Sequence, residues 1–312
     1  MVTQSLYGRG ENDMVRMARG SEMNDADLQV FEDARPRLLG LAYRILGTRA
    51  DAEDCVQDCF LKWSVADRTQ INAPVAWLSS VCARRSLDLL RAASRKRVDY
   101  FGRWLPEPIH AATPPAVDSK LAASLTTAFL LLLERLTPKE RAAYLLHEIF
   151  EQSYAETAAM LDMDEAACRQ LVSRARRNID HDKVRHVTPR ETQDSLLRAF
   201  QSAVMSGSTT QLAALLSTDI RLIMDSGGKT RAATHVLEGG DAFNVLSRAH
   251  VWWKGCDWEI TDLNGGRGAI LIKDNRPGLT ISLACNEAGQ PSDIFIVLNP
   301  DKLARLECVN IH

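Results

Sequence analysis

The 312-residue sequence contains no apolar run long enough to cross a membrane. A membrane helix needs about 20 consecutive apolar residues, and the apolar run at 129–133 is far shorter. A secretory signal pattern is also absent. We therefore expect a cytoplasmic protein that makes no contact with membranes.

The cysteines lack the spacing of a zinc motif or a disulfide framework. Seven of them are scattered along the chain, and none forms CxxC. Cys55 and Cys59 share a helix face at their spacing, but no nearby Cys or His pair completes a zinc site. We predict buried, reduced thiols and no bound metal or cofactor. A phosphate-binding loop and a nucleophile triad are also absent, so we do not expect an enzyme.

The chain has no strong excess of charge of either sign. Its formal net charge is −2, with 46% hydrophobic and 25% charged residues, which is ordinary for a globular protein of two or three domains. The charges are nevertheless uneven, since acids gather at 51–58 and bases at 84–97 and 169–185. A near-neutral total does not exclude DNA binding, because acidic faces can serve protein partners.

Residues 136–179 have the pattern of a helix-turn-helix. Thr137-Pro138 is typical of a helix start, and Ser153 with Glu156 predicts a capping box at the next one. The turn at 161–164 needs a left-handed residue, which Asp tolerates. The last helix should begin at Asp164 or Glu165, where negative charge is favourable.

The outward face of that last helix is rich in arginine. Such side chains can contact base edges and phosphates in the major groove. A plain helical hairpin with a solvated basic face is the alternative. The residues predicted to contact DNA are Arg169, Gln170, Ser173, Arg174, Arg176 and Arg177.

The rest of the chain divides by pattern into further segments. We expect disorder at 1–25, an all-helical domain at 26–98, a proline-rich linker at 99–120, the helix-turn-helix domain at 121–186 and an α+β domain at 190–312. In the last domain the patterns predict helices at 192–205 and 209–216. Strands are expected at 220–224, 250–254, 258–263, 268–273, 279–285 and 294–298.

Residues 28–182 together resemble an RNA polymerase sigma factor of the extracytoplasmic-function group. The segments LLGLAYRILGTRADAEDCVQDCFLKW and AWLSSVCARRSLDLLR look like the helices of the first sigma domain, and the helix-turn-helix falls where the fourth sigma region should be. The resemblance implies a subunit that directs core polymerase to promoters, contacting the beta-prime clamp, the beta flap and promoter DNA. The alternative is a ligand-responsive DNA-binding regulator that never joins the polymerase.

That resemblance assigns three sets of residues. The arginine helix would read the minus-35 element. Polymerase docking would use the acidic residues Asp51, Glu53, Asp54 and Asp58. Minus-10 recognition would use Arg68, Gln70, Asn72, Arg84, Arg85 and Arg91.

The last domain resembles the SnoaL-like extension, an NTF2-like cone, that is fused to one group of these sigma factors. WLPEP at 104–108 and NPDKL at 299–303 are intact, whereas the group's DGGGK is DSGGK at 225–229. The resemblance implies two all-α domains followed by an α+β cone that regulates them in cis. The residues expected at this contact are Trp104, Leu105, Pro106, Glu107, Pro108, Asp225, Gly227, Gly228, Lys229, Asn299, Pro300, Asp301 and Lys302.

A cone fold can also hold a ligand or a catalytic site. Trp252, Trp253 and Trp258 could line an apolar pocket for a small-molecule ligand. Acid–base side chains are present, although no arrangement of them is specific enough to name a base. They are Asp225, His235, His250, Asp257 and Asp262.

Overall fold

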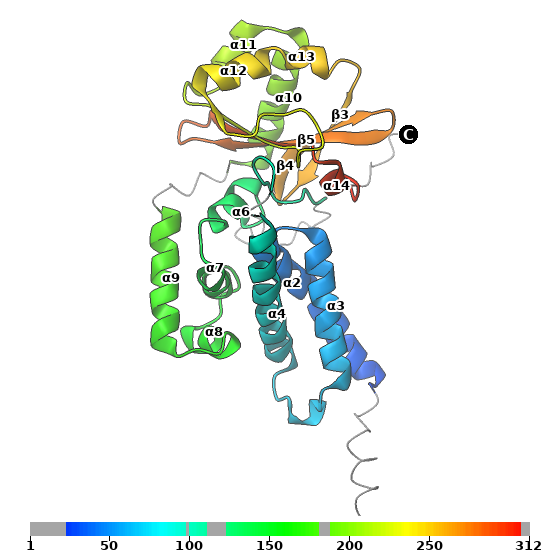
Figure 1. Cartoon of the computed structure of the whole chain (residues 1–312), viewed down its shortest axis with the longest axis vertical. Helices are drawn as coiled ribbons and strands as arrows, with labels where there is room; N and C mark the ends of the chain where they lie inside the picture. Colours follow the sequence, from blue (N-terminus) through cyan, green and yellow to red (C-terminus); the bar gives the residue numbers. More distant parts are fainter. Residues whose placement is uncertain (1–22, 98–99, 111–122, 181–187, 307–312) are drawn as a thin grey trace, which may run out of the picture.

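The computed structural model describes residues 23–97, 100–110, 123–180 and 188–306. Two groups of helices lie below a layer formed by a sheet and its own helices (Figure 1). Most of the predicted N-terminal disorder, at 1–22, lies outside the described residues, as do part of the predicted linker and the end of the predicted helix-turn-helix domain. Among the helices that are described, none combines the length and the apolar character needed to cross a membrane.

The first group of helices is a three-helix unit with capped ends. Gly47, with φ of 77°, ends the first long helix, and the Thr48 side chain accepts from Asp51 N to begin the next. Gly47 can take this left-handed conformation without a Cβ clash. The elements are α2 (Asp25–Leu46), α3 (Arg49–Val65), the 3-10 turn η1 (Arg68–Gln70) and α4 (Pro74–Arg97).

The helix-turn-helix forms as its local signals predicted. The Glu156 carboxylate accepts from Ser153 N at 2.8 Å, and the Ser153 hydroxyl accepts from Glu156 N at 3.2 Å. Asp162 takes the left-handed turn with φ of 53°. The elements are α6 (Thr127–Leu133), α7 (Pro138–Tyr144), the π-turn η2 (Leu145–Ile149), α8 (Tyr154–Met160) and α9 (Glu165–Asp180).

The two groups of helices share one apolar core. α4 packs against α7 and α8. The buried Arg141 of α7 donates to the Ile45 carbonyl of α2 at 2.8 Å, and its Nη1 also pairs with Glu134. The helical parts are therefore packed together rather than strung on a linker.

The last domain is a six-stranded sheet covered on both faces. Its strand order is β2-β1-β6-β5-β4-β3, with only β1 and β6 parallel. Helices cover one face, while the linker, α6 and α14 approach the other (Figure 1). The central strand β6 is buried at every residue, as expected for a strand covered on both sides. The helices are α10 (Arg190–Ser206), α11 (Thr209–Leu215), α12 (Gly239–Ser247), α13 (Ala249–Trp252) and α14 (Pro300–Leu303). The strands are β1 (Arg221–Asp225), β2 (Leu237–Glu238), β3 (Asp257–Leu263), β4 (Gly266–Lys273), β5 (Arg276–Cys285) and β6 (Pro291–Val297).

The predicted fold class, two all-α units followed by an α+β unit, is confirmed, and the layout agrees with the predicted cone. One predicted strand is wrong, because 250–254 contains the helix α13. A short run of β-branched and aromatic residues does not distinguish a strand from a buried helical turn. The short strand β2 and the helix α12 had no counterpart in the prediction.

Candidate functional site

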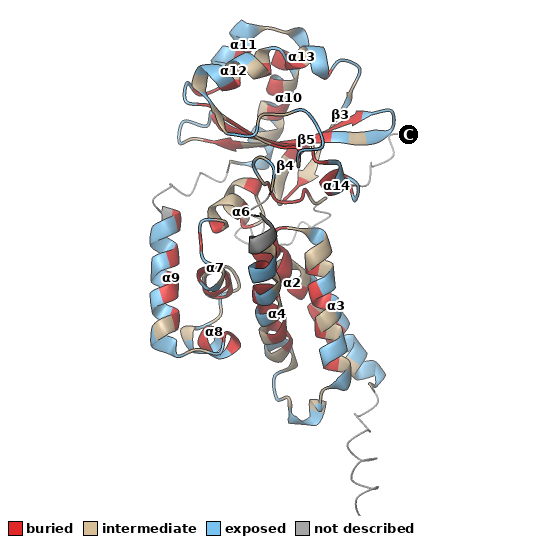
Figure 2. Ribbon diagram, in the orientation of Figure 1, coloured by how far each residue is buried: buried red, intermediate tan, exposed pale blue. Residues whose placement is uncertain are grey.

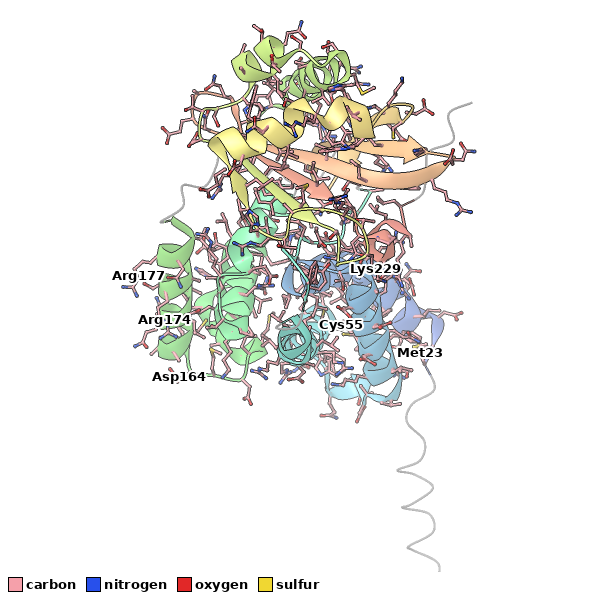
Figure 3. All side chains as sticks on the ribbon, turned by 45° about the horizontal axis from the view of Figure 1, so that its top comes forward. Met23, Cys55, Asp164, Arg174, Arg177 and Lys229 are labelled. Carbon is pink, nitrogen blue, oxygen red and sulfur yellow. The ribbon has the colours of Figure 1, made fainter. Side chains whose placement is uncertain are left out.

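The arginine face of α9 is open to solvent. Cys168, Val172 and Ala175 are fully buried against the rest of the unit. The six residues predicted to contact DNA are all exposed on the opposite side (Figures 2 and 3). The pattern predicted from the sequence therefore holds in three dimensions.

Three of these arginines have acidic partners within the same unit. Arg174 Nε lies 3.0 Å from Glu140, and Arg169 and Arg176 pair with Glu165 and Glu148. All three arginine side chains are about half exposed. The Arg169–Glu165 pair is exposed on both sides and contributes roughly 0–1 kcal/mol, so Arg169 can turn to a phosphate at little cost.

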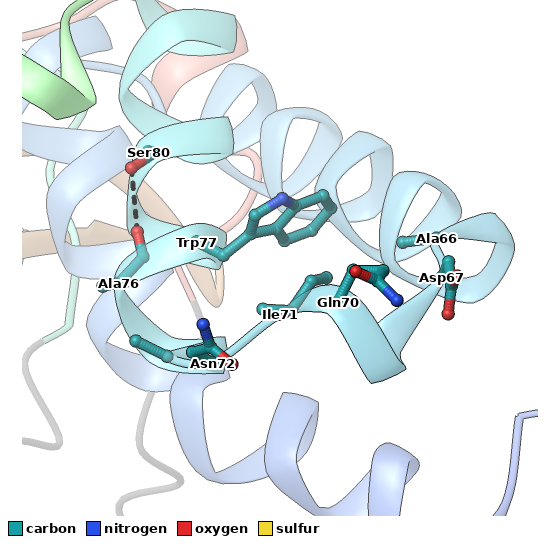
Figure 4. Close-up of a pocket in the computed structure, with 9 residues that line it drawn as sticks. Ala66, Asp67, Gln70, Ile71, Asn72, Ala76, Trp77 and Ser80 are labelled. Carbon is teal, nitrogen blue, oxygen red and sulfur yellow. Dashed lines mark hydrogen bonds between the residues drawn. The ribbon is translucent and has the colours of Figure 1, made fainter.

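A surface pocket of about 520 Å³ lies where the predicted minus-10 loop meets α4 (Figure 4). Gln70 and Asn72 line it with exposed side chains. Trp77 is partly buried and also lines the pocket, with its ring tilted against that of the buried Trp63 and the ring centroids 5.7 Å apart. The pocket thus combines amide groups with an aromatic ring.

The prediction that Arg68 contacts DNA is corrected. Its side chain is only 6% exposed, with Nε bound to Asp27 at 2.9 Å and Nη1 to the Trp63 carbonyl at 2.8 Å. A buried guanidinium needs such acceptors, so Arg68 holds the end of α3 to the start of α2. Sequence reasoning placed it in a polar loop and could not see the distant carboxylate.

The other arginines predicted for the minus-10 element differ in their surroundings. Arg84 and Arg91 are exposed on α4. Arg85 pairs with Asp58 at 2.6 Å, so the predicted DNA and docking sets touch each other there.

The predicted docking face on α3 is partly occupied within the chain. The Asp51 carboxylate accepts from the Thr48 hydroxyl at 2.6 Å, and Asp54 is exposed. Glu53 pairs with Arg49 of its own helix and, at 3.0 Å, with Arg305 just after α14. The last domain therefore reaches the acidic face of the first.

The linker backbone is held by a buried ion pair of the last domain. Leu105 N donates to Asp225 Oδ2 at 2.8 Å, while the Leu105 carbonyl accepts from Lys302 Nζ at 2.5 Å. Lys302 also pairs with Asp225 at 2.6 Å, and both side chains are buried. WLPEP, DSGGK and NPDKL therefore meet at one place, which we call the linker clamp: Trp104, Leu105, Glu107, Asp225 and Lys302.

Trp104 lies between the last domain and the first helical unit. Its ring faces the Lys302 ammonium, 4.4 Å from the centroid. It also packs on Gly47, where an added Cβ would lie 2.4 Å from the Trp104 ring. Only glycine suits this position, since the backbone is left-handed and the indole fills the space of a side chain.

Glu107 joins the linker to the start of α3. Its carboxylate accepts from Arg49 N at 2.8 Å, its N–H donates to the Gly47 carbonyl, and its own carbonyl accepts from the Tyr43 hydroxyl at 2.6 Å. Burial raises the pKa of the Glu107 carboxyl, and the hydrogen bond from Arg49 N opposes this. A carboxylate at a helix N-terminus also meets the positive end of the helix dipole.

The remaining predicted contact residues surround the clamp. Gly227 packs on Asn299, Gly228 packs on Phe101, and Lys229 pairs with Asp301 at an exposed position. Pro106 and Pro108 are buried, and Pro300 opens α14. The structure thus brings the three motifs together.

Sequence reasoning missed two polar residues of this region. Tyr100 donates to Asp225 Oδ1 at 2.6 Å and accepts from Asn299 at 2.9 Å. Asn264 donates to the Tyr43 hydroxyl at 2.7 Å and accepts from Ile109 N at 3.0 Å. In the sequence Asn264 is only part of an Asn-Gly-Gly turn, and no local signal identifies its partners.

The three tryptophans proposed to line a ligand pocket do not converge. Trp253 and Trp258 pack against each other at 5.6 Å in the core beneath the helices, whereas Trp252 is 57% exposed. Two proposed acid–base residues have other partners, since Asp225 belongs to the clamp and Asp262 pairs with Arg267 at 2.6 Å. A small-molecule ligand for this domain stays a prediction.

Comparison with known proteins agrees with this architecture. The family model Sigma-70 region 2 matches residues 30–96, and Sigma-70, region 4 matches 126–179. The sigma factor SigJ of Mycobacterium tuberculosis is 37% identical over 219 residues, covering 69% of this chain and 70% of SigJ. SigI from the same species is 28% identical over 86% of this chain and 92% of its own length.

A solved structure gives the same result for nearly the whole chain. The crystal structure of M. tuberculosis SigJ matches with a TM-score of 0.70 and 31% identity, covering 89% of this chain and 98% of that one. The level of identity and the extent of the match to SigJ decide the family. The chain belongs to the extracytoplasmic-function (ECF) RNA polymerase sigma factors.

Proposed function

We propose that this sigma factor reads its promoter with two separate surfaces. The pocket beside loop 66–73 receives a base of the unwound minus-10 strand, and α9 reads the minus-35 duplex. The acidic face of α3 docks on the beta-prime clamp of the polymerase, and the helix-turn-helix unit docks on the beta flap. The last domain regulates these contacts in cis.

The chemistry of the pocket supports the minus-10 assignment. The Gln70 and Asn72 amides can both donate and accept hydrogen bonds, as an exposed base edge requires. Trp77 supplies an aromatic face in the same pocket, and single-stranded bases stack on such faces. The exposed Arg84 lies further along α4, where it would follow the phosphate backbone.

A single observation carries the proposal of regulation in cis. The linker segment that joins the two DNA-reading units is held by the Asp225–Lys302 pair at Leu105, and by the start of α3 at Glu107. The last domain is therefore fastened to the first unit through the linker. It also reaches the docking face through the Arg305–Glu53 pair.

The direct packing of the two helical units connects the linker clamp to promoter reading. By the positions for which they are named, the minus-10 and minus-35 elements lie roughly 25 base pairs apart, which is about 85 Å of B-form DNA at about 3.4 Å per base pair. In the described arrangement α4 instead packs directly on α7 and α8. The two units must separate to read both elements, so a clamp that fixes the linker controls how readily they do so.

Transcription in vitro with purified core polymerase tests the regulation. We expect Trp104→Ala to change promoter-dependent transcript yield several-fold. Trp252→Ala is the matched control, because Trp252 is an exposed tryptophan of the last domain that lies outside the clamp. If transcription by the Trp104 variant equals that of wild type, the clamp does not regulate.

The pocket is tested by base preference. We expect Asn72→Ala to reduce discrimination at one minus-10 position by about 1–3 kcal/mol, roughly 5- to 150-fold. Thr69→Ala in the same loop is the control, since Thr69 is exposed but does not line the pocket. Equal base preference in both variants would remove the pocket from promoter reading.

A further inference from the structure

Three cysteine side chains meet inside the first helical unit. The Sγ atoms of Cys55, Cys59 and Cys82 all lie within 4.8 Å of one another, and Cys55 Sγ is 4.0 Å from Cys82 Sγ. All three residues are fully buried (Cys55 is labelled in Figure 3). The sequence showed only the first two as a pair, because Cys82 comes from a different helix.

The arrangement has the form of a two-helix ligand set. Cys55 and Cys59 are four residues apart on α3, and Cys82 and Ser86 are four residues apart on α4, so each pair shares a helix face. The buried Ser86 Oγ lies 3.3 Å from Cys55 Sγ. Metal–sulfur bonds of about 2.3 Å in a tetrahedral site place sulfurs about 3.8 Å apart, which is close to the spacing present.

A metal ion would displace the thiol protons of this cluster when it binds, because thiolates are the ligands.

We propose that Cys55, Cys59 and Cys82 form a binding site for a soft, thiophilic metal ion. Thiolate ligands select Cu(I) and Zn(II) among biological metals. Three sulfurs alone satisfy Cu(I), whereas tetrahedral Zn(II) needs a fourth ligand. The buried Ser86 Oγ, which lies 3.3 Å from Cys55 Sγ, is the candidate for it. The bound ion would cross-link α3 to α4.

The proposed metal site lies between the two helices that present loop 66–73. α3 and α4 are joined by loop 66–73, which carries the pocket beside Trp77. A cross-link between the two helices stiffens the hairpin that presents this loop. This consequence depends on the proposed function, whereas metal binding itself does not.

Metal titration of the reduced, full-length protein tests the site. Cu(I) and Zn(II) are added in separate anaerobic experiments, with Cd(II) as a spectroscopic probe for the zinc arm. We expect one equivalent to bind with a thiolate charge-transfer band and a raised Tm. Cys82→Ser should weaken binding at least about 10-fold, whereas Cys168→Ser, which alters a buried cysteine of α9, should not.

A measurement on the wild type covers the case in which Cys82→Ser fails to fold. Metal should protect Cys55, Cys59 and Cys82, but not Cys168, from alkylation in mild denaturant. Ser86→Ala separates the two ions, because it should weaken Zn(II) binding and leave Cu(I) binding unchanged. Absence of the band with both metals, or equal alkylation with and without metal, overturns the site. None of these readouts depends on transcription, so this result and that of the proposed function are separable.

Discussion

Two short segments that connect helices in this sigma factor differ in how far they are buried. Loop 66–73 and the WLPEP segment at 104–108 both contain polar residues and both connect helices. The loop leaves Gln70 and Asn72 exposed around an open pocket. In WLPEP, Leu105, Pro106, Glu107 and Pro108 are buried.

The difference lies in where the backbone groups find partners. The backbone of WLPEP bonds to side chains that are distant in sequence, such as Lys302, Asp225 and Tyr43. Such bonds allow a polar backbone to be buried. A segment held in this way acts as a joint between domains, while a segment whose side chains stay in solvent is available to a ligand.

Removing the buried charge at the clamp should have the largest effect. Lys302→Met leaves Asp225 buried without its cation, which costs about 3–5 kcal/mol. Lys229→Met is the control, because the Lys229–Asp301 pair is exposed and contributes about 0–1 kcal/mol. Denaturant unfolding of both variants measures the difference, and equal losses would mean that the clamp contributes little.

Adding a methyl group at Gly47, next to the clamp residue Trp104, should reduce the free energy of unfolding by a smaller amount. Gly47 and Gly255 have nearly equal φ values of 77° and 78°, but only Gly47 faces Trp104. Gly255→Ala should cost about 1–2 kcal/mol from backbone strain alone, and Gly47→Ala should cost about 1–3 kcal/mol more from the clash. Free energies of unfolding measure how much more stability Gly47→Ala loses than Gly255→Ala. This excess should shrink in the double variant that also carries Trp104→Ala. An excess that persists in the double variant would point to another cause.

The smallest effect concerns pH. Because burial raises the pKa of Glu107 above the usual 4.5, the folded chain binds the proton more tightly than the unfolded chain. Tighter proton binding by Glu107 therefore stabilises the folded chain at low pH. This stabilisation is complete below pH 4.5 and is lost as the pH rises through the raised pKa. Glu107→Gln removes it, so the difference between variant and wild type should change across that window.

Glu156 gives the matched comparison of opposite sign. Hydrogen bonds from the Ser153 side chain and backbone lower its pKa. Its contribution is present above 4.5 and is lost as pH falls through the lowered pKa. As the pH falls, the difference in free energy of unfolding between Glu156→Gln and wild type should therefore change with the opposite sign to that of Glu107→Gln. The same sign in both variants would contradict the causes given for the two pKa shifts.

Much of the fold was predictable because its signals are local. The Ser153–Glu156 box and the left-handed Asp162 each depend on residues within a few positions, so they can be recognised in the sequence. The errors have a different origin. Arg68 is buried in an ion pair with Asp27, which lies 41 residues earlier in the sequence, and the run at 250–254 forms a helical turn despite its Val and Trp residues.

The sequence by itself determined the two helical units, the exposed arginine face of α9 and the three motifs of the clamp, since helix periodicity and caps act over a few residues. Only the tertiary structure decided that Leu105 is held by Asp225 and Lys302, which are 120 and 197 residues away. It also brought Cys82 to Cys55 and placed Asn264 against Tyr43. Each of these contacts depends on how whole helices and strands pack. A buried backbone group needs a hydrogen-bond partner, but local sequence patterns do not identify which distant residue provides it.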